Sequence, residues 1–295
     1  MNNRSSVLSF LPCIDSPDMA SAREQELNIR RAKAIKLGKS AVGAAQRGYY
    51  INSADAKVDW SHQVANALSQ KISIPPDTPL KTSEQRHADT QVQVSNETTL
   101  QVSRRLTKMG HRTLALNFAN GIHPGGGFLG GARAQEEVLC RSSALYSTLI
   151  GDPMYQHNHR RSYPDSSDWI IYSPDVPVFR TDEGTEIDKP WLLSFITSPA
   201  PYAPVVGQPK SGDLLEKRIH RVLEVASAYG YSTLVLGAWG CGAFGNNTYR
   251  TAKDFRKALE LDFQGHFTHI SFAITDWSTN RKFLGPFRDV FTPDI

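Results

Sequence analysis

Two adjacent glutamates, Glu136 and Glu137, follow a loop that has almost no side-chain bulk. Five glycines occupy the seven positions 125 to 131, within the stretch HPGGGFLGGARAQEE. Glycine lets backbone N–H groups approach a ligand closely and allows positive φ, although fixing it costs entropy. A carboxyl group in an apolar pocket, or beside another carboxylate, keeps its proton near neutral pH. The pattern therefore predicts a site where bare backbone and a general acid face the same ligand.

A second glycine loop has the sequence GAWGCGAFGNN, from Gly237 to Asn247, between an apolar stretch and a predicted helix. Backbone N–H groups in such a loop, beside a helix N-terminus, can bind an anion such as a diphosphate. A tight turn is the ordinary explanation of one such loop, but two loops at equivalent positions favour a ligand. Neither loop has the Gly-Lys-Ser/Thr ending of a Walker A motif or the ribose-binding acid of a dinucleotide fingerprint. Kinase and dehydrogenase functions are therefore disfavoured.

The elements around these loops alternate between strand and helix patterns after residue 97. Several of the strands are almost entirely apolar, as in TLALNFAN and TLVLGAWG. Such strands alternating with helices predict an α/β fold, a three-layer domain with a buried mixed sheet. Ligands bind at the strand ends of such sheets, where both loops lie. The predicted strands begin near residues 113, 169, 191, 233 and 269, and the predicted helices cover 97–109, 135–149, 214–229, 249–261 and a closing segment to 291.

The N-terminal part differs in character. Residues 18–47 are rich in Ala, Lys, Arg, Glu and Leu, which predicts one or two helices ending at Gly48. The stretch 73–96 contains Pro75, Pro76 and Pro79 followed by a polar run, which is typical of a boundary. We therefore expect an N-terminal helical extension over residues 1–85 and a catalytic domain over residues 86–295.

The composition of the 295-residue chain limits the possible partners. A net charge of +4 favours an anionic ligand only mildly and predicts no sequence-specific nucleic acid binding. No stretch approaches the ~18 apolar residues of a membrane span, and the apolar patch near the start is short for a secretion signal. The three cysteines are widely spaced and lack a C-x-x-C pair. We expect a cytoplasmic protein with no membrane partner.

The run FAN-x-x-x-PGGG-x-x-x-GA-x-AQEE resembles the signature of the bacterial-type poly(ADP-ribose) glycohydrolases, which are built on a macrodomain. The later loop LGAWGCGAFGNN, the segment FITSPAPYAP and the early RRAKAIKLGKSAVGAAQRGYYI are similar to other parts of that family. Tyr202 stands where the family more often has Asn. The resemblance implies a three-layer macrodomain with an N-terminal helical extension. It also implies an exo-acting hydrolase of ribose–ribose O-glycosidic bonds in poly(ADP-ribose), whose partners are this polymer, ADP-ribose and ADP-ribosylated proteins, with no cofactor.

The same resemblance implies roles for individual residues. Glu137 would protonate the leaving ribose 2′-oxygen and then activate water, while Glu136 would position the leaving unit. Phe244 would pack on the distal ribose, and Asn120 would hydrogen-bond it. The remaining predicted substrate-binding residues are Gly125, Gly126, Gly127, Gln135, Gly240, Cys241, Gly242, Ala243 and Gly245.

Other interpretations stay open from the sequence. Glu136 and Glu137 also suit the first turn of a helix, where acids are favourable against the macrodipole. Cys241 lacks an obvious base and is better read as a small buried hydrophobe. His157 and His159 have no nearby acid or cysteine, so we expect a solvated loop and no metal. A non-catalytic ADP-ribose reader and a mono-ADP-ribosyl hydrolase are the alternative functions.

Overall fold

A computed structural model describes residues 7–292 of the chain, and its centre is an eight-stranded mixed sheet. The strand order is β1-β5-β10-β9-β6-β8-β7-β4, and the pairings from β1 to β8 are parallel while β7 and β4 run antiparallel to their neighbours. The strands are β1 Val7–Phe10, β4 Ile72–Ile74, β5 Asp89–Ser95, β6 Thr113–Ala119, β7 Ile170–Arg180, β8 Glu186–Pro199, β9 Thr233–Leu236 and β10 His269–Ala273.

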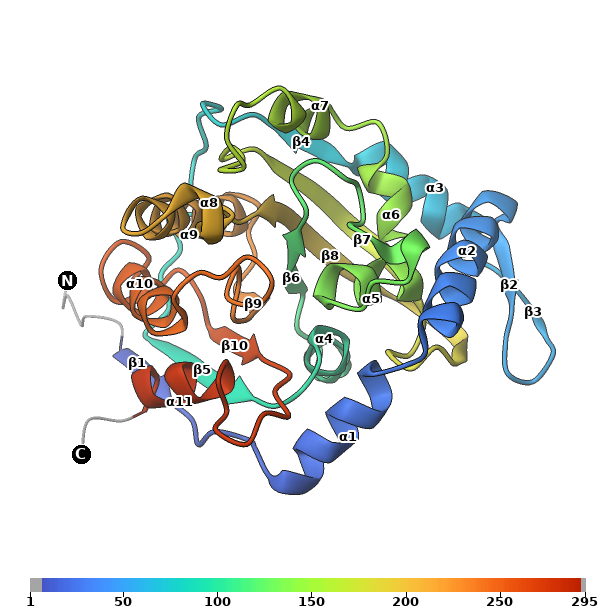
Figure 1. The fold of residues 1–295 in the computed structure, drawn as a ribbon, viewed down its shortest axis with the longest axis horizontal. Coiled ribbons are helices and arrows are strands. Elements are labelled where there is room, and N and C mark those ends of the chain that lie inside the picture. Colours follow the sequence, from blue (N-terminus) through green and yellow to red (C-terminus); the bar gives the residue numbers. More distant parts are fainter. Residues whose placement is uncertain (1–6, 293–295) are drawn as a thin grey trace.

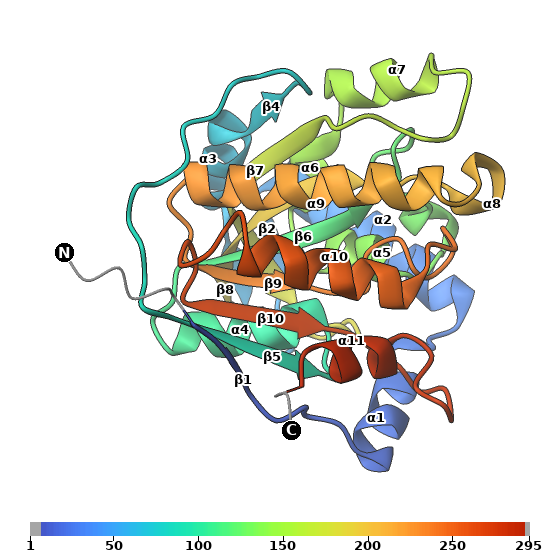
Figure 2. The same cartoon turned by 90° about the vertical axis from the view of Figure 1, so that its left-hand side faces the viewer.

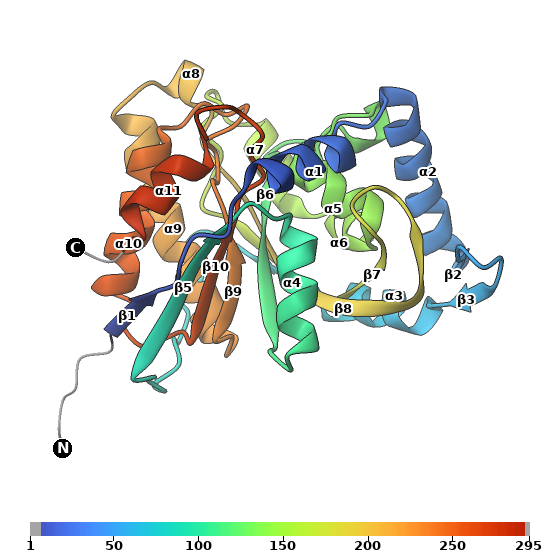
Figure 3. The ribbon, with the colours of Figure 1, turned by 90° about the horizontal axis from the view of Figure 1, so that it is seen from below.

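Helices cover both faces of this sheet, which confirms the predicted three-layer α/β architecture (Figures 1 and 2). One face packs against α9 (Lys210–Ala228), α10 (Thr248–Glu260) and α11 (Leu284–Val290), and the opposite face packs against a second group of helices (Figure 3). That second group comprises α2 Arg31–Arg47, α3 Ser61–Gln70, α4 Thr99–Lys108, α5 Gln135–Ser142 and α6 Leu145–Leu149.

Side-chain alternation along the central strands explains why both faces must be covered. Leu114 and Leu116 of β6 enter the core below α9 and α10, whereas Ala115 between them enters the opposite core. In β9, Leu234 likewise enters the core below α9 and α10, and Val235 enters the opposite core. Successive side chains of a strand point to opposite faces, so an apolar parallel strand needs a helical layer on each side.

The predicted N-terminal helices form, but the first 85 residues also contribute strands. Residues 18–47 contain α1 (Pro17–Leu27) and α2, and α2 ends at the left-handed Gly48 as predicted. Strand β1 pairs with β5 at one sheet edge, and β4 pairs with β7 at the other. A small hairpin of β2 (Tyr49–Ile51) and β3 (Lys57–Asp59) precedes α3. The domain boundary at residue 85 remains a prediction, and this segment holds both edges of the sheet.

Two local predictions differ from the structure. The polar stretch that suggested a boundary contains strand β5, in which Thr90, Val92 and Val94 are buried between β1 and β10. The pair His157 and His159 lies in helix α7 (Pro153–His159), so the expected loop is wrong. The helix begins after Asp152, whose carboxylate accepts the N–H of Met154 as an N-cap. Two further short helices lie within the described residues: α8 covers Ala203–Val206, and the 3₁₀ helix η1 covers Phe128–Gly130.

A buried asparagine ties the two ends of the described chain to the sheet. The Nδ2 of Asn96 donates to Asp15 Oδ1 at 2.8 Å and to the Asp276 carbonyl at 2.7 Å. Its Oδ1 accepts the N–H of Asp276 at 3.0 Å. Arg281 adds an ion pair to Asp15 at 2.7 Å. The N-terminal segment is therefore bonded to the end of β5 and to the loop after β10.

We predict that Asn96→Ala lowers the free energy of unfolding by at least the ~1–3 kcal/mol that follows when buried hydrogen-bonding groups lose their partner. Urea unfolding followed by circular dichroism measures this change. Asn66→Ala is the matched control, because the Asn66 side chain bonds only to Gln70 on the exposed side of α3. Equal stability of the two variants would contradict the structural role of Asn96.

Candidate active site

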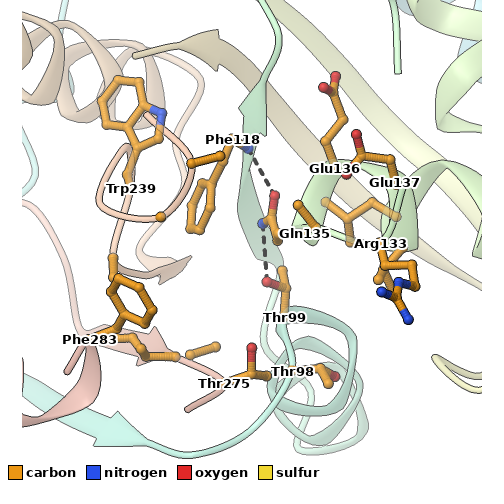
Figure 4. A pocket seen from close by; sticks show the side chains of 18 of the residues that line it. Thr98, Thr99, Phe118, Arg133, Gln135, Glu136, Glu137, Trp239, Thr275 and Phe283 are labelled. Carbon is orange, nitrogen blue, oxygen red and sulfur yellow. Dashed lines mark hydrogen bonds between the residues drawn. The ribbon is translucent and has the colours of Figure 1, made fainter. Parts of the chain in front are cut away.

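A cavity of about 360 Å³ lies at the carboxyl ends of β5, β6, β9 and β10, beside the second glycine loop (Figure 4). The predicted residues that do not line it are Gly125, Gly126, Gly127, Cys241 and Gly245. This volume is within the ~300–1,000 Å³ range of small-molecule sites. The acid pair and Arg133 lie at one end, while Phe118, Trp239 and Phe283 lie at the other. The cavity therefore combines an acidic end with an aromatic end.

The first glycine loop lies directly against the two acids. Gly126 has φ +58°, and a Cβ added to it would fall on Oε1 of Glu137 and within 2.9 Å of Oε2 of Glu136. Gly125 has φ +69°, and its Cβ would crowd the Phe128 ring at 3.0 Å. Glycine is thus required by the acids at position 126, by the Phe128 ring at position 125, and by the backbone conformation at both.

Glu137 keeps one carboxylate oxygen without a protein partner. Its Oε1 accepts the N–H of Gly127 at 2.9 Å. Its Oε2 is buried and makes no hydrogen bond to any part of the chain that the structure describes. Only 8% of the residue is exposed. Because buried polar atoms nearly always have a partner, this oxygen is available to a ligand or to water.

Glu136 is held by the protein through both oxygens. Its Oε2 accepts the backbone N–H of Asn120 at 2.7 Å, and its Oε1 accepts from Asn117 Nδ2 at 3.3 Å. Burial raises the pKa of this carboxyl to about 8, and the charge of Glu137 adds to the rise although the hydrogen bonds oppose it. The protonated form of Glu136 is therefore favoured at neutral pH.

Gln135 connects the acid-bearing helix to the sheet. Its Oε1 accepts the N–H of Phe118 at 2.9 Å, and its Nε2 donates to the Leu116 carbonyl at 2.7 Å and to Thr99 Oγ1 at 3.1 Å (Figure 4). Its amide is thus occupied by β6 and α4 although the residue lines the cavity. The predicted substrate contact of Gln135 remains a prediction, and this geometry favours a positioning role.

Asn120 closes the turn that leads from β6 into the first loop. Its Oδ1 accepts the N–H groups of Ile122 and His123, each at 2.9 Å. Its own N–H is the donor to Glu136 described above. The side-chain nitrogen makes no hydrogen bond within residues 7–292, and Asn120 lines the cavity. A contact from this nitrogen to a bound sugar is therefore available.

The second loop presents three successive backbone N–H groups without an intramolecular acceptor among the described residues, those of Gly242, Ala243 and Phe244. All three residues line the cavity. Asn246 braces the loop, because its Nδ2 donates to the carbonyls of Pro201 at 2.9 Å and Gly240 at 3.1 Å. Consecutive free N–H groups before the N-terminus of α10 form the kind of nest that binds anions.

The other predicted residues of this loop serve its shape. Gly240 has φ +74° and Gly245 has φ +65°, so both favour glycine. Cys241 is buried, burial raises the pKa of its thiol to about 11, and its Sγ lies 3.5 Å from the Trp239 carbonyl. A nucleophilic thiolate is disfavoured there. The ring of Phe244 is half-buried and packs edge-on against Tyr202 at 5.8 Å, which places Tyr202 behind it.

Several cavity residues were not identified from the sequence. Phe118 and Phe283 bring two rings to the aromatic end from β6 and from the start of α11. Asp182 lies at the β7–β8 turn, where burial raises its pKa to about 7 and Thr98 Oγ1 donates to its Oδ2 at 2.8 Å. Phe118 belongs to the quoted FAN run, whereas nothing local in the sequence links Phe283 or Asp182 to the loops.

The described residues contain neither a metal-binding cluster nor a helix that could cross a membrane. Residues 7–292 contain no group of three or more His, Cys, Asp or Glu side chains arranged to hold a metal ion. None of the helices in that range is both long enough and apolar enough to cross a membrane.

Comparison with known proteins gives consistent matches. Residues 38–181 match the family model "Microbial-type PARG, catalytic domain". The structure of poly(ADP-ribose) glycohydrolase from Thermomonospora curvata is 38% identical with a TM-score of 0.83, over 88% of this chain and 99% of that chain. The same enzyme was also solved with the inhibitor ADP-HPD, at 37% identity and a TM-score of 0.82, with the same coverage.

The matches extend to a second organism. The poly(ADP-ribose) glycohydrolase of Deinococcus radiodurans in complex with ADP-ribose is 37% identical with a TM-score of 0.71, over 79% of this chain and 98% of that chain. No curated protein matches the chain at a comparable level of significance.

The raised pKa of Glu136 predicts a pH-dependent stability. The carboxyl titrates at about 8 in the folded protein and near its ordinary 4.5 when unfolded. Between these values the folded state binds one proton more than the unfolded state, so stability falls as pH rises through this window. Glu136→Gln removes this proton, and we expect its unfolding free energy to fall less than that of the wild type between pH 5 and 9.

Urea unfolding of both proteins at several pH values measures the difference. Asp182, whose pKa is also raised, is present in both proteins, so its contribution cancels. Parallel stability curves for wild type and Glu136→Gln would show that the proton does not reside on Glu136.

Proposed function

This chain belongs to the family of microbial-type poly(ADP-ribose) glycohydrolases, and from that membership we propose that it hydrolyses the ribose–ribose O-glycosidic bonds of poly(ADP-ribose) and releases ADP-ribose. The observation that carries the proposal is the buried Glu137. One of its oxygens is held by Gly127 of the first loop, and the other has no partner within the described chain. A general acid needs such a free atom beside the bond that it protonates.

The charges of the cavity support one orientation of the substrate. A diphosphate carries two negative charges and suits the free N–H groups of Gly242, Ala243 and Phe244. The acidic end, which holds the proton donor Glu137, is left for the glycosidic bond. The distal ribose then lies between the two loops, near Phe244 and the side-chain nitrogen of Asn120. The adenine is left for the aromatic end, where Phe118 and Phe283 offer rings for stacking.

In the proposed reaction, the bond between C1″ of the distal ribose and the 2′-oxygen of the next unit breaks. Glu137 donates a proton to that oxygen as it leaves, and the sugar develops oxocarbenium character. The Glu137 carboxylate then takes a proton from water while the water oxygen bonds to C1″, which restores the acid. Glu136, whose carboxyl has a raised pKa, positions the leaving unit.

The substrate itself supplies stabilisation for the sugar cation. With the diphosphate on the second loop and the distal ribose on the first, the phosphate charge lies close to the reacting carbon. Opposite charges at short range in a water-poor site attract strongly. A second catalytic carboxylate, which most glycosidases use, is therefore not required.

Two other functions would use the same cavity. A non-catalytic ADP-ribose reader would need the N–H nest but not a buried acid with a free oxygen. A mono-ADP-ribosyl hydrolase would use the acid on a different leaving group. We further propose that ADP-ribosylated proteins present the polymer and that the protein acts in the cytoplasm, which agrees with its free Cys13, Cys140 and Cys241.

The test of the proposed function is turnover of poly(ADP-ribose) by Glu137→Gln. Glutamine keeps the size of glutamate and can accept the Gly127 N–H, but it delivers no proton. We expect the rate to fall by the ~10²- to 10⁴-fold typical of losing general acid–base catalysis. ADP-ribose binding, measured by calorimetry, should persist in this variant. The Glu136→Gln variant should lose less of its turnover rate. A folded Glu137→Gln protein with near-normal turnover would refute the mechanism.

The products of the wild type distinguish the mode of cleavage and the alternative functions. We propose action mainly at chain ends, so the first products of polymer digestion should be monomeric ADP-ribose, with the unit attached to protein left in place. Early long oligomers would contradict chain-end action. Release of ADP-ribose from mono-ADP-ribosylated protein alone would favour the mono-ADP-ribosyl hydrolase, and binding without release would favour the reader.

A third variant tests the N–H nest. A Cβ added to Gly242 meets no atom within 4 Å, and its φ is not in the left-handed region, so Gly242→Leu should fold normally. Its side chain would crowd the diphosphate, and ADP-ribose affinity should fall at least tenfold, on the order of 1.4 kcal/mol. Gly130→Leu is the control, because that glycine is equally open and does not line the cavity. Equal affinities for the two variants would remove the second loop from the site.

A further inference from the structure

Helix α2 carries a row of exposed cations and no acid. Residues 30–47 contain no Asp or Glu. The four residues Arg30, Lys33, Lys36 and Lys39 are solvent-exposed, and their side chains make no ion pair or hydrogen bond within residues 7–292. Many cations elsewhere are paired, for example Lys71 with Asp152 at 2.7 Å and Lys257 with Glu216 at 2.9 Å. The surface formed by Arg30, Lys33, Lys36 and Lys39 is called the α2 basic face below.

This arrangement works against the stability of the helix. The first turn of α2 contains no acid, and the N-cap residue Arg30 makes no side-chain capping bond. Positive charge near a helix N-terminus opposes the macrodipole. Like charges three residues apart, as at 33, 36 and 39, also repel each other. Burial of Ala41 and Ala44 holds the helix in place, but no carboxylate within residues 7–292 pairs with these cations, so an external anion is their natural partner.

Helix α2, which carries the α2 basic face, borders the first glycine loop through other residues. Arg31 Nε donates to the carbonyl of Gly130 at 2.8 Å. Gly131 lies so close to α2 that an added Cβ would be 2.8 Å from the Arg31 carbonyl and 2.9 Å from Ile35. Helix α2 also packs beside α5, which carries the two acids (Figures 1 and 3). The cations therefore lie on a helix that borders the acid-bearing helix and the first loop.

We propose that the α2 basic face binds the diphosphates of the poly(ADP-ribose) units beyond the scissile bond, on the leaving side. The inference rests on the proposed function, which places the scissile bond at Glu137 and directs the rest of the polymer out of the acidic end. Each unit carries a diphosphate, so the polymer is a regular polyanion. Lysines bind phosphate as mobile point charges, which suits a flexible chain without a fixed register.

The proposal separates two kinds of binding. The cavity holds the terminal unit through specific contacts, whereas the α2 basic face attracts the following units by charge alone. Such an interaction depends on salt, because each phosphate contact releases counterions. It should lower KM for long polymers and leave the chemical step unchanged. Free ADP-ribose and a two-unit substrate gain little from it.

The experiment compares wild type with the triple variant Lys33→Gln/Lys36→Gln/Lys39→Gln. Gln keeps helix propensity near that of Lys. The control is Lys81→Gln/Lys108→Gln/Lys253→Gln, which removes the same charge from exposed positions on other elements. Lys81 has only a fully exposed pair with Glu84, which contributes little. KM and kcat are measured on long polymer and on a two-unit substrate at several salt concentrations, and ADP-ribose affinity is measured by calorimetry.

For the α2 triple variant we expect about a tenfold higher KM for long polymer at low salt. The slope of log KM against log salt concentration should be smaller than that of wild type by about two. Its kcat, its ADP-ribose affinity and its KM for the two-unit substrate should match those of wild type and control. An equal KM on long polymer for all three proteins would overturn the proposal. So would an equal loss on long and short substrates, or single-stranded DNA binding to the α2 basic face with the polymer KM unchanged. If the wild type releases no ADP-ribose from either substrate, the proposed function itself fails.

Discussion

The contact between the bare backbone at Gly126 and Gly127 and the carboxyl groups of Glu136 and Glu137 is the constraint on which the site depends. The acids occupy the volume that a side chain at Gly126 would fill, and the Gly127 N–H holds one oxygen of Glu137. Gly126 and Gly127 contact the acids, and neither residue lines the cavity. A loop with any larger residue at Gly126 would have to displace the acids, so loop and acids form one unit.

The sheet fixes this unit through amide side chains. Gln135 bonds to both neighbours of Asn117 along β6, and Asn117 itself contacts Glu136. The first turn of α5 is thus tied to the last residues of a buried strand, and the acids cannot shift without breaking strand contacts. Such preorganisation suits general acid catalysis, where the acid must be placed before the bond breaks. It also explains why the glycine loop and the QEE sequence occur together.

The sequence predicted most of the fold because its signals are local. Apolar strands such as Thr113–Ala119, glycine loops and the Gly48 helix end depend on residues close in the chain. Strand β5 was not predicted, because its sequence is mostly polar. Its alternate residues are buried only because β1 and β10 lie on either side of it. Asp182 and Phe283 line the cavity but lie far from the glycine loops in the sequence, so no motif spacing predicts their place in the site. The raised pKa of Glu136 likewise depends on burial. The adjacency of Glu136 and Glu137 in the sequence suggests a shifted pKa, but it cannot indicate which of the two carboxyl groups is shifted.

The charge distribution connects the cavity with the surface around it. Inside, the acid end holds one ionisable oxygen free on Glu137 while Glu136 stays protonated, and the donor groups gather on the opposite loop. In the proposed binding mode, these free N–H donors favour an elongated anion whose phosphates lie on the second loop. Outside the cavity, helix α2 borders the acid-bearing helix and carries exposed cations. A polyanion that leaves the cavity on the acid side would meet this positive surface, which favours one direction of the bound chain.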